Sequence, residues 1–333
     1  MCGIAGIVAT RPVNPQAVER MNVLQEHRGP DDSGLWSSKD KNIILGHRRL
    51  SIIDTSSAGH QPMTSGAQVI TYNGEIYNYL EIAKKLKVLG VKLNSASDTE
   101  VLLKAYQQWG EQALEELNGM FAFAIYDAES QLLFCARDRF GEKPFLFYSA
   151  DDRFIFASEY KALFALDGIS TNYDNERILR FLYHPTQGLD DDLQTCFDDI
   201  KQLPPGHCLK LDVKTLKIKI KRYWDISPNN EFAKMTEPEA QIHFRELLTD
   251  SVKLRMRSDV PLGSCLSGGL DSSAIVCLAH ELRGSNQSYD VFTGRFPGTE
   301  ADEWSWEEKV ITTTSATSHI TIPRVEDFRD ELS

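Results

Sequence analysis

Short apolar or alternating runs, each bounded by turn residues, dominate the chain up to residue 190. Runs of this length and pattern are typical of β-strands that bury one or both faces. We therefore expect two stacked sheets with helices outside them. The predicted strands cover residues 2–8, 43–47, 68–72, 120–126, 132–137, 145–148 and 154–157.

Two stretches with a helical period interrupt these strands. Ser97-Asp98-Thr99-Glu100 has the spacing of a capping box directly before the periodic stretch 101–109, and Gly110 follows as a stop signal. A second helix is predicted over residues 79–89, ending at Gly90. Both helices fit the outside of the predicted sheets.

Pro, Asn and charged residues accumulate between residues 190 and 235, where we place the domain boundary. Two alternating strands, 207–212 and 216–224, fall inside this stretch. The sequence thus predicts a first domain over residues 2–190, a linker with connecting strands over 191–235 and a second domain over 236–333.

In the second domain helical and strand patterns alternate, which predicts a parallel sheet with ligands at the carboxyl ends of its strands. A doubly wound sheet usually has about five or six strands, whereas three precede the charged, helical-looking segment 325–333. Either the chain is a fragment or this α/β domain is unusually small. The expected helices cover 240–256, 273–282 and 303–314, and the expected strands cover 260–266, 288–293 and 319–322.

Composition narrows the class of protein. The chain has 333 residues, 41% of them hydrophobic, which suffices for two cores at about 150 residues per domain. Its net charge of −12 disfavours nucleic acid and anionic membranes as partners. No apolar run approaches the ~20 residues of a membrane span, and the apolar start lacks the basic flank of a secretory signal. We expect a cytoplasmic protein with small-molecule partners.

The six cysteines include no CxxC pair and no Cys/His spacing suited to zinc, so neither structural disulfides nor a protein-built metal site are expected. Cys2 differs from the others by its position. If the initiator Met1 is removed, Cys2 carries both a thiol and a free α-amino group, and the amine can act as base for its own nucleophile. The alternative is a buried structural cysteine.

Five further motifs follow Cys2 in order: Arg28–Gly34, His47–Asp54, Asn73–Asn78, Ser97–Glu100 and Arg137–Pro144. With Cys2 they closely resemble the N-terminal-nucleophile glutaminase domain of class II glutamine amidotransferases. The resemblance implies an α+β fold of four αββα layers. It also implies hydrolysis of glutamine to glutamate and ammonia.

The resemblance assigns roles that the chemistry supports. Cys2 is the nucleophile, and Asn73 and Gly74 supply the donors for the developing oxyanion. Arg49 can bind the α-carboxylate of glutamine, and Asp98 its α-ammonium with Glu75 close by. Alone, Arg49 and Asp98 would be read as surface charges. The remaining glutamine-binding residues implied by the resemblance are Leu50, Ser51, Ile52 and Ile53.

A second motif, Ser267-Gly268-Gly269-Leu270-Asp271-Ser272-Ser273, lies between a predicted strand and a predicted helix. Glycines, hydroxyls and a helix N-terminus can cradle phosphate, although the lysine of a Walker A loop is absent. A Gly/Ser turn can also be only a loop. This one resembles the pyrophosphate loop of ATP pyrophosphatases, which implies ATP binding, Mg²⁺ at Asp271, and adenosine contacts from Leu266 and Gly294.

The two halves together are similar to glutamine-hydrolysing asparagine synthetases, and phosphoribosyl-transferring amidotransferases lack the second motif. The resemblance implies transfer of ammonia to an adenylated aspartate, which gives asparagine, AMP and pyrophosphate, and it suggests a homodimer. Two alternatives stay open. The acceptor can be another carboxylate, on a sugar, an antibiotic or a peptide, or the chain can be a glutaminase or a non-catalytic partner whose ATP loop is idle.

Overall fold

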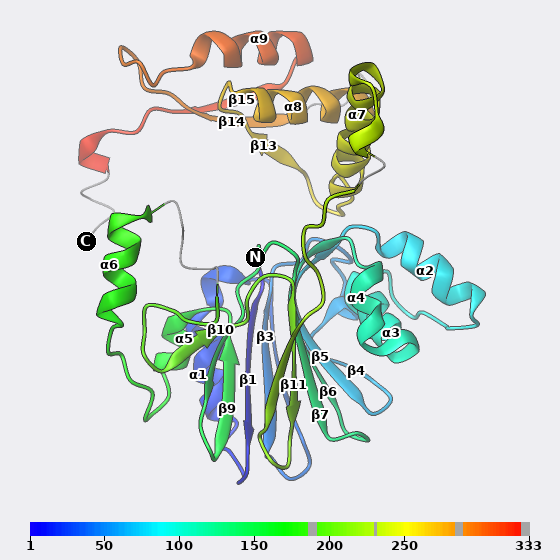
Figure 1. Ribbon diagram of the computed structural model, residues 1–333, viewed down its shortest axis with the longest axis vertical. Helices are drawn as coiled ribbons and strands as arrows, with labels where there is room; N and C mark the ends of the chain where they lie inside the picture. The colour runs from blue at the N-terminus through cyan, green and yellow to red at the C-terminus, as the bar shows by residue number, and fades with distance from the viewer. Residues whose placement is uncertain (186–191, 230–231, 284–288, 328–333) are drawn as a thin grey trace. The chain divides into compact units, whose positions relative to one another are not determined.

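The structure is a computed structural model that describes residues 1–185, 192–229, 232–283 and 289–327. The chain divides into two compact units, Met1–Ser227 and Pro228–Ser333 (Figure 1). The first unit is therefore longer than the first domain of the sequence prediction, which ends at residue 190.

Two six-stranded antiparallel sheets form the first unit. In the first sheet the order is β10-β8-β9-β1-β3-β2, and in the second it is β12-β11-β7-β6-β5-β4. The first contains β1 (Gly3–Ala9), β2 (Asp32–Ser37), β3 (Ile43–Arg49), β8 (Leu146–Ser149), β9 (Arg153–Ala157) and β10 (Ile200–Gln202). The second contains β4 (Met63–Ser65), β5 (Gln68–Ile76), β6 (Gly119–Asp127), β7 (Leu132–Arg137), β11 (His207–Asp212) and β12 (Ile218–Arg222).

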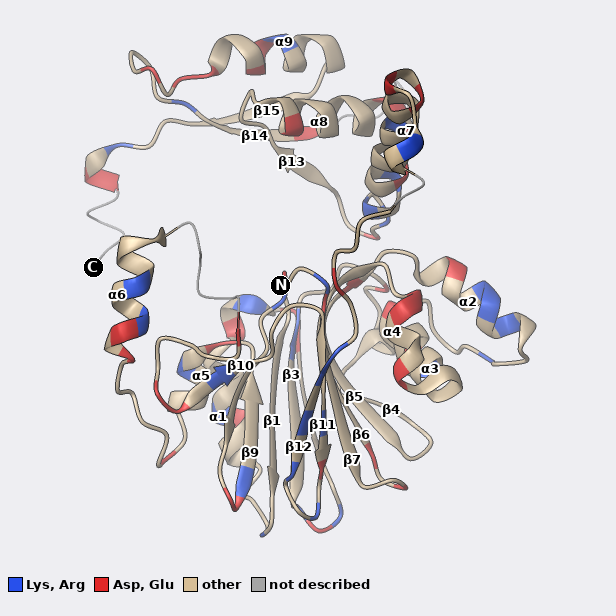
Figure 2. Cartoon of the chain, in the orientation of Figure 1, with Lys and Arg blue, Asp and Glu red and all other residues tan. Residues whose placement is uncertain are grey.

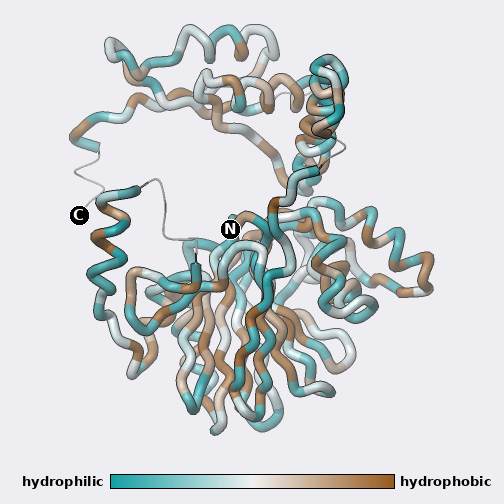
Figure 3. The backbone as a smooth tube through the Cα atoms, in the orientation of Figure 1, coloured by the Kyte–Doolittle hydropathy of each residue, from teal (hydrophilic) through white to brown (hydrophobic). Residues whose placement is uncertain are grey.

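Alternation along the strands builds three apolar layers. On β6, Ala122 and Ala124 pack into the cluster between the two sheets, whereas Phe121, Phe123 and Ile125 pack into the cluster on the outer face of the second sheet. Because successive side chains point to opposite faces, one strand serves two layers. Figure 3 shows the apolar residues running along these strands.

Helices cover both outer faces. α1 (Gln16–Leu24) and α5 (Tyr160–Phe164) share a cluster with the first sheet, and α2 (Tyr79–Val88), α3 (Asp98–Trp109) and α4 (Ala113–Glu116) share one with the second. A further helix, α6, spans Asn175–Tyr183. Figure 2 shows charged residues along α2 and α6, whereas β1, which is central in the first sheet, carries none. The predicted αββα sandwich is thereby confirmed.

The strands expected at 207–212 and 216–224 are present as β11 and β12, but they extend the second sheet instead of connecting two domains. β11 pairs with β7, and its Leu209 and Leu211 are fully buried between the sheets. Burial of these alternating leucines makes the segment part of the first core.

The second unit has a parallel sheet in the order β13-β14-β15, as the alternation predicted. The strands are β13 (Gly263–Cys265), β14 (Asp290–Gly294) and β15 (Thr317–Thr321), and the helices are α7 (Glu237–Arg255), α8 (Leu270–Arg283) and α9 (Trp304–Thr314). One apolar cluster, including Leu266, Val276 and Val291, holds these elements together. Most of the predicted helical segment 325–333 lies outside the described residues. Among the described residues no helix is long and apolar enough to cross a bilayer.

Candidate active site

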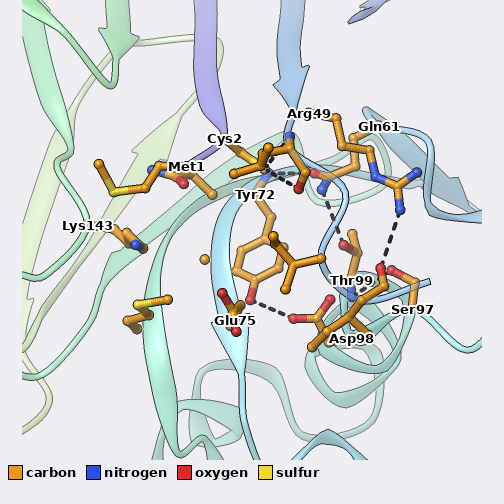
Figure 4. A pocket seen from close by; sticks show the side chains of 16 residues that line it. Met1, Cys2, Arg49, Gln61, Tyr72, Glu75, Ser97, Asp98, Thr99 and Lys143 are labelled. Carbon is orange, nitrogen blue, oxygen red and sulfur yellow. Dashed lines mark hydrogen bonds between the residues drawn. The ribbon is translucent and has the colours of Figure 1, made fainter. Parts of the chain in front are cut away.

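A cavity lies where the start of β1, the end of β3, the second half of β5 and the N-terminus of α3 meet (Figure 4). Every residue predicted for the glutaminase site lines it except Ser51, whose backbone N–H donates to Asp31 instead. The lining consists of Met1, Cys2, Arg49, Leu50, Ile52, Ile53, Gln61, Tyr72, Asn73, Gly74, Glu75, Ser97, Asp98, Thr99, Met120 and Lys143.

The thiol of Cys2 is fixed directly before β1. Leu50 N donates to Cys2 Sγ at 3.3 Å, and the thiol can donate to Leu50 O at 3.6 Å. Arg28 Nε donates to Cys2 O at 2.9 Å. Burial raises the pKa of the Cys2 thiol, so the resting group is protonated and needs a base before it can attack.

Met1 also lines the cavity, and burial lowers the pKa of its α-amino group. With Met1 in place, the nitrogen of Cys2 belongs to an amide and cannot act as a base. Removal of Met1 would leave an amine in a setting that favours its neutral form, which is the form a base requires.

Asn73 on β5 has a side chain without a partner. The residue is 1% exposed, and neither its Oδ1 nor its Nδ2 forms a hydrogen bond within the described part of the chain. A buried amide left unpaired is costly, so its place beside the cavity indicates a ligand as the partner.

Gly74 follows Asn73 at a point where β5 and β6 approach closely. A Cβ at Gly74 would lie 2.1 Å from Met120 O, so only glycine fits. This leaves the backbone of Gly74 as part of the cavity wall beside the Asn73 amide.

Arg49 faces the cavity at the end of β3, and part of its guanidinium holds the following loop. Nη1 donates to Ser56 O at 2.8 Å, and Nη2 donates to Ile53 O at 3.4 Å and to Asp54 O. Three of the five N–H donors of an arginine are thus used on the backbone, and two remain for a ligand.

Asp98 opens α3 and is 5% exposed. Its Oδ2 accepts from Tyr72 Oη at 2.9 Å and from Ile76 N at 3.0 Å. Burial raises the pKa of Asp98 to about 6 against these hydrogen bonds. The carboxylate is therefore ionised at neutral pH and can receive a cation.

Two more charges reach the cavity. Burial, and then repulsion from Asp98, raise the pKa of Glu75. Lys143 is 5% exposed, burial lowers its pKa, and its ammonium forms no hydrogen bond or ion pair within the described residues. In Figure 4, Lys143 lies beside Met1, and Arg49 and Asp98 lie on the other side of the cavity.

Lys143 belongs to a quoted motif, but neither it nor Gln61 was among the predicted site residues. Gln61 accepts from Tyr72 N at 2.7 Å and donates to Thr99 Oγ1 at 3.2 Å. Gln61 lies outside the quoted motifs, and the motif that contains Lys143 does not show which of its side chains faces the cavity, because the fold alone brings both residues there.

The second predicted site lies between β13 and α8. Leu266 N donates to Phe292 O at 2.9 Å, and Thr293 Oγ1 donates to Leu266 O at 3.0 Å. Gly294 is the last residue of β14, and the Ser267–Ser273 loop follows β13. Because these two hydrogen bonds join the ends of the two strands, Gly294 and the loop lie at the same edge of the parallel sheet. The space around Gly294 is open, since an added Cβ would meet nothing within 4 Å.

Hydroxyls and a glycine shape the loop itself. Gly268 has a φ of +77°, a conformation that favours glycine. Ser267 N donates to Ser272 Oγ at 3.2 Å, and the two hydroxyls lie 3.1 Å apart. Such a loop at the start of a 14-residue helix is suited to phosphate.

Asp271 is exposed in the first turn of α8. Among the described residues no group of three or more His, Cys, Asp or Glu could hold a metal ion. Mg²⁺ in nucleotide sites is usually bound through one or two carboxylates and the substrate phosphates, so Asp271 fits that mode of binding.

The first unit is thus a sandwich of two antiparallel sheets with a cysteine directly before its first strand, and the cavity at that cysteine holds an unpaired buried amide and charged side chains of both signs. The chain belongs to the glutamine amidotransferase domain family, whose model matches residues 1–224. The asparagine synthase family model matches residues 243–333.

Curated relatives match this chain along most of its length. The chain is 38% identical over 303 residues to a putative glutamine-hydrolysing asparagine synthetase 2 of Methanocaldococcus jannaschii, covering 84% of this chain and 57% of the relative. It is 33% identical over 352 residues to the glutamine-hydrolysing asparagine synthetase 3 of Bacillus subtilis, covering 100% of this chain and 56% of the relative. The chain thus spans about half the length of these relatives.

A solved structure has the same fold. The glutamine phosphoribosylpyrophosphate amidotransferase from Bacillus subtilis, complexed with ADP and GMP, matches with a TM-score of 0.52 at 16% identity. The match covers 96% of this chain and 81% of that one. At this identity the likeness concerns the fold alone.

Proposed function

We propose that the first unit hydrolyses glutamine to glutamate and ammonia with Cys2 as nucleophile. The observation that carries the proposal is the buried, unpaired amide of Asn73 in the same cavity as the Cys2 thiol. Arg49 binds the α-carboxylate, and Asp98 binds the α-ammonium with Glu75 beside it. Leu50, Ser51, Ile52 and Ile53 form the surrounding loop.

The chemistry proceeds through an acyl-enzyme. After removal of Met1, the α-amine of Cys2 takes the thiol proton while sulfur attacks the amide carbon of glutamine. Asn73 Nδ2 and Gly74 N donate to the oxyanion that forms. The intermediate collapses to a thioester, and the protonated amine gives its proton to the departing ammonia. Water then hydrolyses the thioester to glutamate and restores the thiol.

The second unit, in this proposal, binds ATP through residues Ser267–Ser273, with Leu266 and Gly294 at the adenosine and Mg²⁺ at Asp271. When bound, Mg²⁺ neutralises charge on the phosphates. In the whole protein, ammonia is then transferred to an adenylated aspartate to give asparagine. The match of residues 243–333 and the names of the relatives support this acceptor over another carboxylate.

The wider setting belongs to the same proposal. A cytoplasmic location and small-molecule partners agree with the net charge of −12. A homodimer rests on the resemblance alone. Sedimentation of the purified chain at several concentrations measures whether it forms one.

The test of the glutaminase is glutamate release from glutamine by the purified chain. Cys2→Ala is expected to abolish release, because no thiol remains to attack. Cys265→Ala, which removes an exposed cysteine on β13, serves as the matched control and is expected to leave release unchanged. Glutamate release retained by Cys2→Ala would remove Cys2 as the nucleophile.

The test of the synthetase is pyrophosphate release from Mg²⁺-ATP and an ammonium salt, with and without aspartate. Ammonium bypasses the first unit, so the assay reports on the second. Aspartate-dependent release supports asparagine synthesis by these 333 residues. Pyrophosphate release that does not depend on aspartate points to another acceptor. If no pyrophosphate is released, the same assay is repeated with a longer reading frame.

A further inference from the structure

Tyr72 lies on β5 just beyond the residues that pair with β4. At this position side chains, instead of the backbone of β4, form the hydrogen bonds to β5. β4 pairs with β5 only from Gln68 to Ile70. Beyond that point, Tyr72 N donates to Gln61 Oε1 at 2.7 Å, and Tyr72 O accepts from His47 Nε2 at 2.9 Å. Both backbone groups that point away from β6 are therefore held by buried side chains.

The ring of Tyr72 reaches the other end of the cavity. Its side chain is fully buried, and its hydroxyl donates to Asp98 Oδ2 at 2.9 Å (Figure 4). A hydroxyl donating to a carboxylate favours the ionised form and fixes its orientation. Tyr72 thus contacts the proposed ammonium acceptor by its side chain and adjoins Asn73 by its backbone.

We propose that Tyr72 is a positioning residue that sets the preference of the site for an α-amino acid amide. Its hydroxyl holds Asp98 ionised and aligned for the α-ammonium of glutamine. Its backbone, fixed by Gln61 and His47, holds the adjoining Asn73 beside Cys2. The inference rests on the proposed glutaminase function and names how that site selects its substrate.

The two tasks separate in the variant Tyr72→Phe, which removes the hydroxyl and keeps the backbone contacts and the ring. Loss of one hydrogen bond to a charged group is expected to raise KM for glutamine about tenfold with kcat within about twofold. Glutaramate, which is glutamine without its α-amino group, has no ammonium for Asp98. Its kcat/KM is expected to stay unchanged, so the preference for glutamine falls about tenfold.

Tyr126→Phe is the matched control. Tyr126 lies on the neighbouring β6, is 5% exposed, and its hydroxyl accepts from Gln131 Nε2 at 3.1 Å. The same chemical change is made there outside the cavity. Tyr126→Phe is therefore expected to leave the glutamine and glutaramate values unchanged.

A second variant tests whether Tyr72 acts through Asp98. In an Asp98→Asn chain, Tyr72→Phe is expected to leave the preference for glutamine over glutaramate unaltered, because the carboxylate that accepts the hydrogen bond from Tyr72 is absent. An equal further loss in that chain contradicts the proposal.

The outcomes distinguish this inference from the proposed function. If Tyr72→Phe lowers activity on glutamine and glutaramate by the same factor, or leaves the preference unchanged, the inference is wrong while the glutaminase stands. If the unmutated chain releases no glutamate from glutamine, the proposed function fails and the inference fails with it.

Discussion

The proposed role of Asp98 would make glutamine binding sensitive to pH in a range where most carboxylates are already ionised. Burial raises its pKa to about 6, so the folded protein takes up this proton near pH 6 instead of near 4. Protonated Asp98 cannot bind an ammonium. We expect KM for glutamine to be flat above pH 7 and to rise about tenfold per pH unit below pH 6.

Several other charged or titratable groups line the cavity with Asp98: Glu75 and Tyr72 on β5, Arg49 at the end of β3, Lys143, the Cys2 thiol and the α-amino group of Met1. The pKa of Glu75 is also raised, so its protonation weakens ammonium binding in the same direction. Measuring KM separately from kcat isolates binding from the titration of the nucleophile and its base. Asp98→Asn should show a high KM at every pH, and a wild-type KM flat down to pH 5 would contradict the assignment.

At the residue scale, the sequence located the parts of the site that sit in contiguous motifs. Cys2, Asn73 and Asp98 fall within such motifs, and the structure brings all three to one cavity. Lys143 also lies in a quoted motif, but neither it nor Gln61 was predicted as a site residue, because only folding brings their loops to the cavity. Their chemistry depends on burial and on partners that spacing does not encode.

At the element scale, the loop before α3 depends on a buried carboxylate. The sequence predicted a capping box, and Ser97 does cap the helix by accepting from Thr99 N at 3.2 Å. Glu100 does not return to Ser97, whose N–H donates to Ser95 Oγ. Its carboxylate instead accepts from Asn94 N at 2.9 Å and from Ser95 N at 2.7 Å.

Glu100→Gln should therefore loosen this loop. The amide keeps one acceptor and loses the charge, so we expect the free energy of unfolding to fall by about 2 kcal/mol. Denaturant titration measures the change. Glu115→Gln, at an exposed position on α4, is the control and should have little effect. Equal stability of the two variants would show that the Glu100 contacts contribute nothing net.

Asp271 on α8 offers a test of the second unit that needs no turnover. We expect Asp271→Asn to weaken the binding of Mg²⁺-ATP about tenfold, because the proposed role of the carboxylate is to bind the metal. The affinity for ATP in the presence of a chelator should change less. Calorimetry measures both affinities. Asp250→Asn, exposed on α7, is the control, and glutamate release should not change in either variant. Equal losses with and without Mg²⁺ would argue against a metal role.

Element type was predictable wherever apolar periodicity was strong. All seven strands of the first pattern are present, and the helix before Gly110 ends there with a φ of +58° at that glycine. α1 was missed because it is nine residues long and buries only Val18, Met21 and Asn22. β2 was missed because its sequence shows no sustained alternation, and its pairing with β3 defines it.

At the scale of the whole molecule, the clusters of buried apolar residues divide the chain at a different place from the one that composition indicated. Three clusters of buried residues lie within residues 4–216, and a fourth lies within 252–291. No described cluster of buried residues draws on both units. Composition placed the domain boundary near residue 190, whereas the strands after that residue complete both sheets of the first compact unit.

Two truncations test this boundary against each other. A chain ending at Ser227 keeps every strand of the first unit, and we expect it to fold and to release glutamate within about twofold of the full chain. A chain ending at residue 190 loses β10, β11 and β12 together with Leu203, Leu209 and Leu211, each fully buried.

The loss of those three leucines alone removes about 5 to 9 kcal/mol of apolar burial, comparable with the whole stability of a domain. It also exposes β8 and β7 as new sheet edges, which favours aggregation. We therefore expect the shorter chain to be insoluble or unfolded, as measured by thermal unfolding and by glutamate release. Equal activity of both truncations would mean that the last three strands are dispensable. Loss of activity in the chain ending at Ser227 would mean that the glutaminase depends on the second unit.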